Sequence, residues 1–189
     1  MDKVVFEKES HTYRLGGRII PSVTTIMRPL SDAVYGKISP KVLAKKAEKG
    51  TAIHQAIDHY ILFNVFDPEY EHEIRQFIKF LEDKKFSVAM SEIVMCDGQY
   101  AGTADMILKD QKGRLHLYDL KTTTVIHREL VAVQLAGYKL LAQNEGIEIY
   151  QCGVLWLRPG KEYASAPIAP KIRVWRKLLN EYTNKVNEH

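Results

Sequence analysis

Two carboxylates and a lysine in the middle of the chain have the types and spacing that bind metal ions and phosphates. Asp119 and Lys121 stand two residues apart in the run 114–121, and Asp105 lies in the preceding run, 100–108. Side chains two apart on a β-strand point to the same face. Asp119 and Lys121 therefore share a face with two leucines of their run, and we expect this acid and base at the end of a buried apolar stripe.

Two neighbouring runs are expected to bring further acids to the same face. Asp105 shares a face with Thr103 and Ile107, and Glu92 shares one with the apolar residues of the run 87–95. Unpaired buried carboxylates cost several kcal/mol each unless they bind a cation or take up a proton. A divalent cation with oxygen ligands would satisfy them. The alternative is that these acids lie in solvent at strand ends, or that one of them simply pairs with the lysine.

Two polar residues on expected helices point to the same place. His54 lies at the edge of an apolar stripe, so its ring should face the sheet, although a lone histidine there is usually structural. Gln134 lies in the middle of another stripe, and a buried amide without partners costs on the order of 1–3 kcal/mol. Gln134 should therefore have a polar task, either at this site or in capping a backbone group at the sheet edge.

The elements that must position these residues can be read from periodicity. Residues 87–95, 100–108 and 114–121 are of strand length, and residues with turn chemistry separate them, which predicts an antiparallel meander. A fourth strand is expected at 149–157. The N-terminal part predicts a hairpin with Gly16 and Gly17 as its turn.

The remaining segments predict helices. Ser22 should cap a short helix over 23–27 that ends at Pro29. Helices are also expected at 41–49 and 51–64, with Gly50 breaking them apart. The later ones are predicted at 69–85, at 128–144 with Gly146 as C-cap, and at 171–186. This order predicts an α/β fold of the α+β type, a central mixed β-sheet with an antiparallel meander and flanking helices, in one domain over 1–189.

Composition excludes several classes of protein. The 189 residues are 46% hydrophobic and 26% charged, which is typical of a globular protein with a core. We expect no membrane span, since no apolar run approaches the required length, and no secretory signal. Two cysteines exclude a disulfide scaffold or an iron–sulfur site and favour a cytoplasmic protein. A net charge of +4 permits an anionic partner.

Five short elements follow one another in a recognisable order. Four of them are Gly50-Thr51-x-x-His54, Gly102-Thr-Ala-Asp105, Asp119-Leu-Lys121-Thr122 and Gln134-x-x-x-Tyr138, and the leading one runs from His11-x-Tyr13 to Pro21-Ser-Val-Thr-Thr25. Together they resemble the PD-(D/E)XK nucleases of the RecB-like branch, and the leading stretch looks like the phage exonucleases and the mitochondrial genome maintenance exonuclease within that branch. The resemblance spans about residues 11–138, and the chain lacks the cluster cysteines of some relatives and any helicase motif.

The resemblance implies a role for each matching residue. Mg²⁺ or Mn²⁺ would be bound by His54, Asp105, Asp119, the Leu120 carbonyl and, for a second ion or a metal-bound water, Glu92. One ion or two are both compatible with this set. Because histidine is a softer donor than Mg²⁺ usually takes, Mn²⁺ is a plausible better activator. The implied catalytic residues are Lys121, Asp105, Asp119, Glu92, Gln134 and Tyr138, with Lys121 as the catalytic residue that is not a ligand.

The expected substrate is DNA, single-stranded or at free ends, with a single-strand-binding or recombination protein as a further partner. A cationic groove and stacking aromatics are what single strands require. The groove could be supplied by Lys41, Lys45 and Lys49, which lie four apart, although they could equally form a solvated helix face. Phosphate could be bound by Thr122 and Thr123, with Thr124, unless these residues continue a strand. The candidates for stacking on bases are Tyr35, Tyr60 and Tyr100, which could instead belong to the core. The leading hypothesis is a metal-dependent DNA exonuclease; a structure-specific or nicking endonuclease and a non-catalytic DNA-binding subunit are the alternatives.

Overall fold

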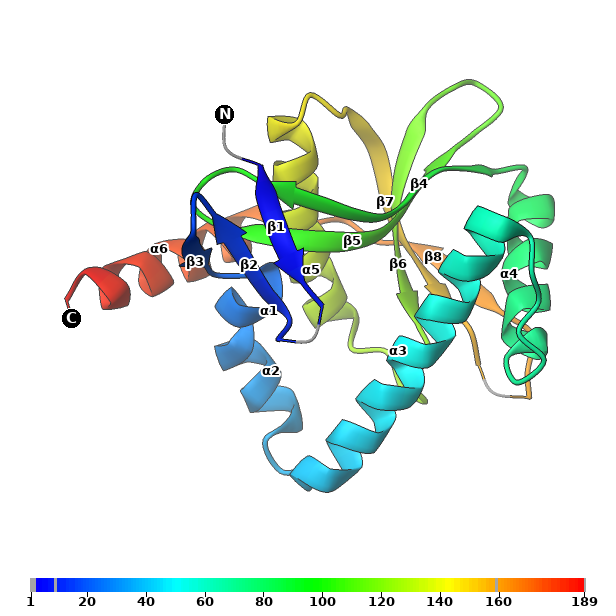
Figure 1. The fold of residues 1–189 in the computed structure, drawn as a ribbon, viewed down its shortest axis with the longest axis horizontal. Coiled ribbons are helices and arrows are strands. Elements are labelled where there is room, and N and C mark those ends of the chain that lie inside the picture. The colour runs from blue at the N-terminus through cyan, green and yellow to red at the C-terminus, as the bar shows by residue number, and fades with distance from the viewer. Residues whose placement is uncertain (1–2, 9, 159, 189) are drawn as a thin grey trace.

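The protein is an α+β structure with two β-sheets and flanking helices (Figure 1), seen in a computed structural model that describes residues 3–8, 10–158 and 160–188. The main sheet has five strands in the order β4-β5-β6-β7-β8, and a smaller sheet has the order β1-β2-β3. The pairing of β6 with β7 is parallel and the other pairings are antiparallel, so the main sheet is mixed, as the sequence predicts.

The chain begins with the three strands of the smaller sheet and ends in a helix. The strands are β1 Val4–Glu7, β2 Thr12–Leu15, β3 Arg18–Ile20, β4 Ser87–Cys96, β5 Ala101–Lys109, β6 Leu115–Lys121, β7 Ile149–Trp156 and β8 Ala164–Pro167. The helices are α1 Val23–Ile26, α2 Arg28–Tyr35, α3 Pro40–Phe63, α4 Glu71–Lys84, α5 Arg128–Asn144 and α6 Ile172–Asn187.

The predicted meander is confirmed by the antiparallel pairing of β4 with β5 and of β5 with β6. Helix α5 then connects β6 to the parallel strand β7, which is the usual way to join parallel neighbours. Strand β8 pairs with β7 at the sheet edge and is not predicted by the sequence, because its residues Ala-Ser-Ala-Pro have little apolar character.

The main sheet is buried on both faces, which gives two hydrophobic clusters. One cluster joins the sheet to α1, α5 and α6 and includes Leu117 and Trp175. The other joins it to α3 and α4 and includes Phe77, Tyr118 and Leu120. Successive residues of β6 therefore enter opposite cores, as a period of two requires. Helices therefore cover both faces of the sheet, and the carboxyl end of β6 lies between α3 and α5.

The predicted N-terminal hairpin and the cap of the first helix are confirmed. Leu15 pairs with Arg18, and the two glycines between them have positive φ angles of 55° and 80°, as a tight hairpin turn requires. Ser22 caps α1 by accepting a hydrogen bond from the Thr25 backbone N–H at 3.0 Å. Pro29 follows the end of α1 but also lies in the first turn of α2, a helix that the sequence pattern does not predict.

The predicted break at Gly50 is wrong, because α3 runs without interruption from Pro40 to Phe63. A glycine inside a helix costs about 1 kcal/mol relative to alanine and does not forbid the helix. Helix α3 passes close to another segment here: a Cβ on Gly50 would lie 3.3 Å from Thr122 Oγ1, a contact tighter than usual. Gly50 thus lets α3 pass directly beside the residue that follows β6.

No helix in the described parts of the chain has both the length and the apolar character needed to cross a bilayer.

Candidate metal centre

Strands β5 and β6 are paired from Lys109 opposite Leu115 to Met106 opposite Tyr118. The candidate metal centre lies just beyond that last pair. There the Asp105 carboxylate takes the place of a backbone partner: its Oδ2 accepts the Leu120 N–H at 2.6 Å. The sequence pattern places Asp105 on β5, and this bond fixes the direction in which its carboxylate points.

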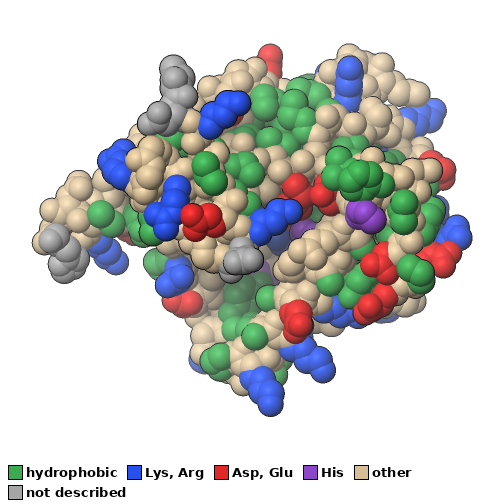
Figure 2. All heavy atoms as spheres, viewed as in Figure 1, with side chains coloured by type: hydrophobic (Ala, Val, Ile, Leu, Met, Phe, Trp, Pro, Cys, Tyr) green, Lys and Arg blue, Asp and Glu red, His purple; other side chains and the backbone are tan. Residues whose placement is uncertain are grey.

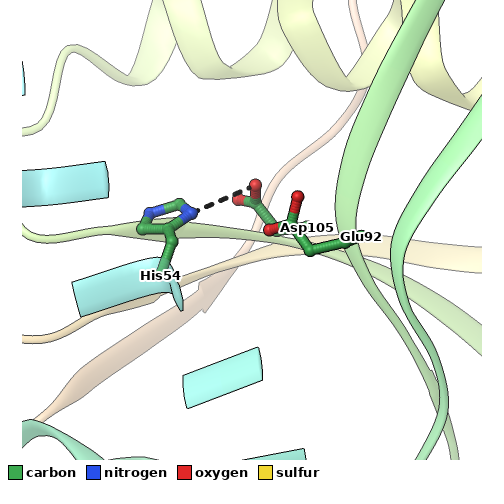
Figure 3. A group of neighbouring side chains, drawn as sticks. All are labelled: His54, Glu92 and Asp105. Atoms are coloured by element: carbon green, nitrogen blue, oxygen red, sulfur yellow. Dashed lines mark ion pairs between the residues drawn. The ribbon is translucent and has the colours of Figure 1, made fainter. Parts of the chain in front are cut away.

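Helix α3 supplies a histidine to the same carboxylate. His54 Nδ1 lies 3.4 Å from Asp105 Oδ1, and the two side chains are only 24% and 18% exposed. Figure 3 shows the imidazole pointing from α3 toward Asp105, with Glu92 entering beside it. One ligand atom from each of these three residues lies within 4.8 Å of the others, which is close enough to hold one metal ion.

Glu92 reaches this group through an unusual backbone conformation. Ser91 pairs with Met106 and Ile93 pairs with Ala104, so Glu92 lies opposite Asp105 in the register of β4 and β5. Its φ angle is +46°, in the left-handed region that non-glycine residues rarely adopt. The residue as a whole is exposed, while its carboxyl group approaches the partly buried Asp105 and His54.

A second set of polar contacts holds Lys121 on the side of the sheet covered by α5. Lys121 Nζ lies 3.0 and 2.8 Å from the two carboxylate oxygens of Asp119, which is 2% exposed. The same ammonium donates to Gln134 Oε1 at 3.2 Å, and Gln134 Nε2 donates to the Tyr138 hydroxyl at 3.3 Å. The polar residue in the middle of the α5 stripe therefore contacts Lys121, and does not cap the sheet edge.

Burial and neighbouring charges shift the pKa values of the three carboxyl groups. Burial and the neighbouring Asp105 charge raise the pKa of Glu92 to about 7. Burial, opposed by Lys121, raises the pKa of Asp119 to about 6. For Asp105, burial would raise the pKa, but the attraction of His54 outweighs it and the pKa is lowered.

The pKa values of the two basic groups, His54 and Lys121, are raised. Burial would lower the pKa values of His54 and Lys121, but Asp105 raises that of His54, and Asp119 together with Asp105 raises that of Lys121. A divalent cation next to these groups would favour their ionised forms. One imidazole and two carboxylates also form a donor set suited to Mn²⁺ or Mg²⁺. The residues present therefore fit a divalent ion.

The group of three does not include every predicted ligand. Asp119 pairs with Lys121 instead, the contact that the sequence left open as an alternative. The Leu120 N–H is bound by Asp105, and Leu120 lines the small pocket beside His54 and Glu92. Ligation by Asp119 and by the Leu120 carbonyl stays a prediction.

The predicted nucleic-acid residues lie in several places around the site. Lys41, Lys45 and Lys49 are exposed on the N-terminal half of α3, which lies at the bottom of the view in Figure 1. Figure 2 shows basic side chains at the bottom of the same view. Thr122 lies beside Gly50, and the Thr123 hydroxyl donates to the Val125 carbonyl at 2.8 Å. Both threonines lie in a loop, so they do not continue the strand.

The three predicted stacking tyrosines differ in their surroundings. Tyr100 cannot stack on a base, because it is 1% exposed, packs on Trp175 and donates to the Gly137 carbonyl. Tyr60 is partly buried against the α3–α4 core. Tyr35 is half-buried on α2, edge-on to His127 at 5.1 Å, and is close enough to Lys121 for that charge to influence its pKa.

Two polar contacts of the site were missed by sequence reasoning. Ser91 Oγ donates to Asp58 Oδ1 at 2.7 Å, next to Glu92. The Tyr13 hydroxyl bonds to Thr103 Oγ1 at 2.8 Å, two residues before Asp105 on β5. The spacing of four residues between His54 and Asp58 on one helix face was a signal that could have identified the first of them.

Comparisons with known proteins give distant structural likenesses. No protein-family profile matches the sequence, and no curated protein matches it. Among solved structures, the alkaline exonuclease LHK-Exo from Laribacter hongkongensis in complex with dAMP is similar with a TM-score of 0.48 and 10% identity, over 87% of this chain and 79% of that one. The phage-related exonuclease from Haemophilus somnus 129PT is similar with a TM-score of 0.43 and 10% identity, over 88% and 96%. The chemistry of the site has to come from its own residues.

Proposed function

We propose that residues 1–189 form one nuclease domain that hydrolyses DNA with a divalent metal ion, acting as an exonuclease on single strands or free ends. The observation that supports this most is the convergence of His54, Glu92 and Asp105 next to a lysine that Asp119 and Gln134 hold in place. A cation site beside a fixed ammonium group is the arrangement needed to bind and cleave a phosphodiester.

The chain's own residues divide the work of hydrolysis. When bound, Mg²⁺ or Mn²⁺ lowers the pKa of water and offsets the charge of the scissile phosphate. Lys121 has a raised pKa and is protonated at neutral pH, so it can hold the attacking water or stabilise negative charge on the phosphate oxygens. Gln134, itself bonded to Tyr138, limits the directions in which the Lys121 ammonium can point.

The surface next to the site suits a polyanion. The exposed lysines of α3 precede His54 on the same continuous helix and add positive charge within a few helical turns of the metal centre, which attracts a polyanion. Tyr35 lies near Lys121, and its ring meets that of His127 edge-on, so this pair offers aromatic surface on which a base could stack. We propose these residues as the DNA path, with Thr122 and Thr123 as phosphate contacts at its inner end.

The test is a time course on end-labelled linear single-stranded DNA, linear duplex and circular single strands, each with Mn²⁺, Mg²⁺ or EDTA. The proposal predicts loss of linear single strands with either metal, faster with Mn²⁺, and none with EDTA. Cleavage of the circular strand would instead indicate an endonuclease. DNA binding without any cleavage would indicate a non-catalytic subunit, and cleavage in EDTA would contradict the metal requirement.

A further inference from the structure

One hydrogen bond ties together the two elements that carry ligands on either side of the candidate ion. Ser91 Oγ donates to Asp58 Oδ1 at 2.7 Å, across 33 positions of the chain. Asp58 lies one helical turn after His54 on α3, and Ser91 directly precedes Glu92 on β4. Both residues line the same small pocket as the ligand group.

The backbone of Glu92 has a conformation that contacts from neighbouring residues must hold in place. Glu92 has a left-handed backbone within a strand, a conformation that is unfavourable for a residue with a side chain and persists only when the surroundings enforce it. Strand β4 lies at the edge of the sheet, so β5 is its partner on one side only. A return of Glu92 to ordinary strand geometry would change the direction of its carboxyl group relative to Asp105.

We infer that Asp58 and Ser91 are positioning residues that hold Glu92 toward the metal ion. The inference rests on the proposed metal-dependent function and adds two residues to it. Asp58 acts through its hydrogen bond to Ser91 and not as a ligand, and Ser91 acts through the backbone of Glu92. Contacts of this kind around metal ligands typically change metal affinity by about 10- to 100-fold when they are removed.

The experiment measures Mn²⁺ affinity by calorimetry, together with the unfolding temperature. Ser91→Ala should weaken Mn²⁺ binding roughly tenfold, whereas Ser91→Thr, which keeps the hydroxyl, should restore most of it. Ser87→Ala is the matched control on the same strand, because its hydroxyl contacts only the Lys109 carbonyl at 3.5 Å. Equal affinity in Ser91→Ala and Ser87→Ala would overturn the inference.

A double-mutant cycle separates positioning from general stability. In a Glu92→Gln background, Ser91→Ala should cause little further loss of Mn²⁺ affinity, because the ligand it positions is already gone. Equal losses in both backgrounds would overturn the inference. At Asp58, substitution by Ala should cost more affinity than substitution by Asn, which still accepts the hydroxyl; equal losses would show that the Asp58 charge acts on the ion directly and would contradict the positioning role.

These outcomes are distinct from a failure of the proposed function. If the unaltered protein binds no Mn²⁺, both the function and the inference fail. If it binds Mn²⁺ and cleaves DNA but Ser91→Ala does neither worse, only the inference fails.

Discussion

The carboxylate of Asp105 accepts the backbone N–H of Leu120 at 2.6 Å, in place of a strand-to-strand hydrogen bond. Leu120 is 2% exposed, so this N–H has no access to bulk water. The same carboxylate faces His54 with its other oxygen. A single side chain therefore joins β5 to β6 and is also the proposed metal ligand.

This double role predicts different effects of two substitutions at Asp105. Asp105→Asn keeps an acceptor for the Leu120 N–H and loses only the charge that faces His54, whereas Asp105→Ala also leaves a buried donor unpaired and should cost about 1–3 kcal/mol more. Both should abolish cleavage. Urea unfolding of the two variants checks the difference, and equal stabilities would show that the hydrogen bond does not support the fold.

Lys121 should be needed for cleavage but not for binding. Lys121→Ala removes the ammonium that Asp119 and Gln134 hold, and we expect a loss of at least about 100-fold in cleavage rate. Binding of single-stranded DNA in Ca²⁺ should survive. Lys177→Ala, on the exposed face of α6, is a control with the same charge change. A Lys121→Ala protein that cleaves at the normal rate would remove this residue from the mechanism.

The stability of the metal-free protein should fall as pH rises from about 5 to about 7.5. The pKa of Glu92 is about 7 in the folded protein against an ordinary 4.5, and that of Asp119 is about 6 against 3.8. The folded state therefore binds more protons than the unfolded chain in this range, and stability is lost as these groups ionise. The raised pKa of His54 acts in the same direction.

Thermal unfolding in EDTA across this pH range is the measurement. Glu92→Gln should flatten the slope, because a neutral amide has no proton to lose. Saturating Mn²⁺ should also oppose the loss, since the ion favours ionised carboxylates. A metal-free protein whose unfolding temperature rises steadily from pH 5 to 7.5 would contradict these pKa directions.

Much of the fold could be predicted from periodicity, and the exceptions have local physical causes. The meander and α5 follow from strong apolar patterns. From sequence alone, Gly50 predicts a helix break. Its close approach to Thr122 is a tertiary contact, which a local pattern does not reveal. Tyr100 is a candidate for stacking in the sequence alone, because composition does not tell a core tyrosine from an exposed one.

The site could be predicted only as far as side-chain direction follows a strict period. Alternation on β6 placed Asp119 and Lys121 together, and they do pair. The left-handed backbone of Glu92 departs from that period, and the Asp58–Ser91 bond joins a helix to a strand, so strand alternation indicates neither of them.

Gly102 should be intolerant of a side chain. A Cβ there would lie 2.6 Å from the ring of Tyr138, closer than packed atoms can approach. Gly102→Ala should therefore lower the free energy of unfolding by about 1–3 kcal/mol. Combined with Tyr138→Ala, the same change should cost less, because the shortest contact is gone and only Val23 Cγ2, at 3.0 Å, still has to give way slightly. Additive losses in the double variant would mean that Gly102 is needed for another reason.

The most direct test of the metal centre is calorimetric titration of Mn²⁺ into the unaltered protein and into Asp105→Asn. The Asn variant keeps the Leu120 hydrogen bond, so it isolates the ligand role from the structural one. We predict saturable binding to the unaltered protein that is weakened at least about tenfold in Asp105→Asn, with Asp32→Asn on exposed α2 unchanged. Identical Mn²⁺ binding by all three proteins would contradict the assignment of this site.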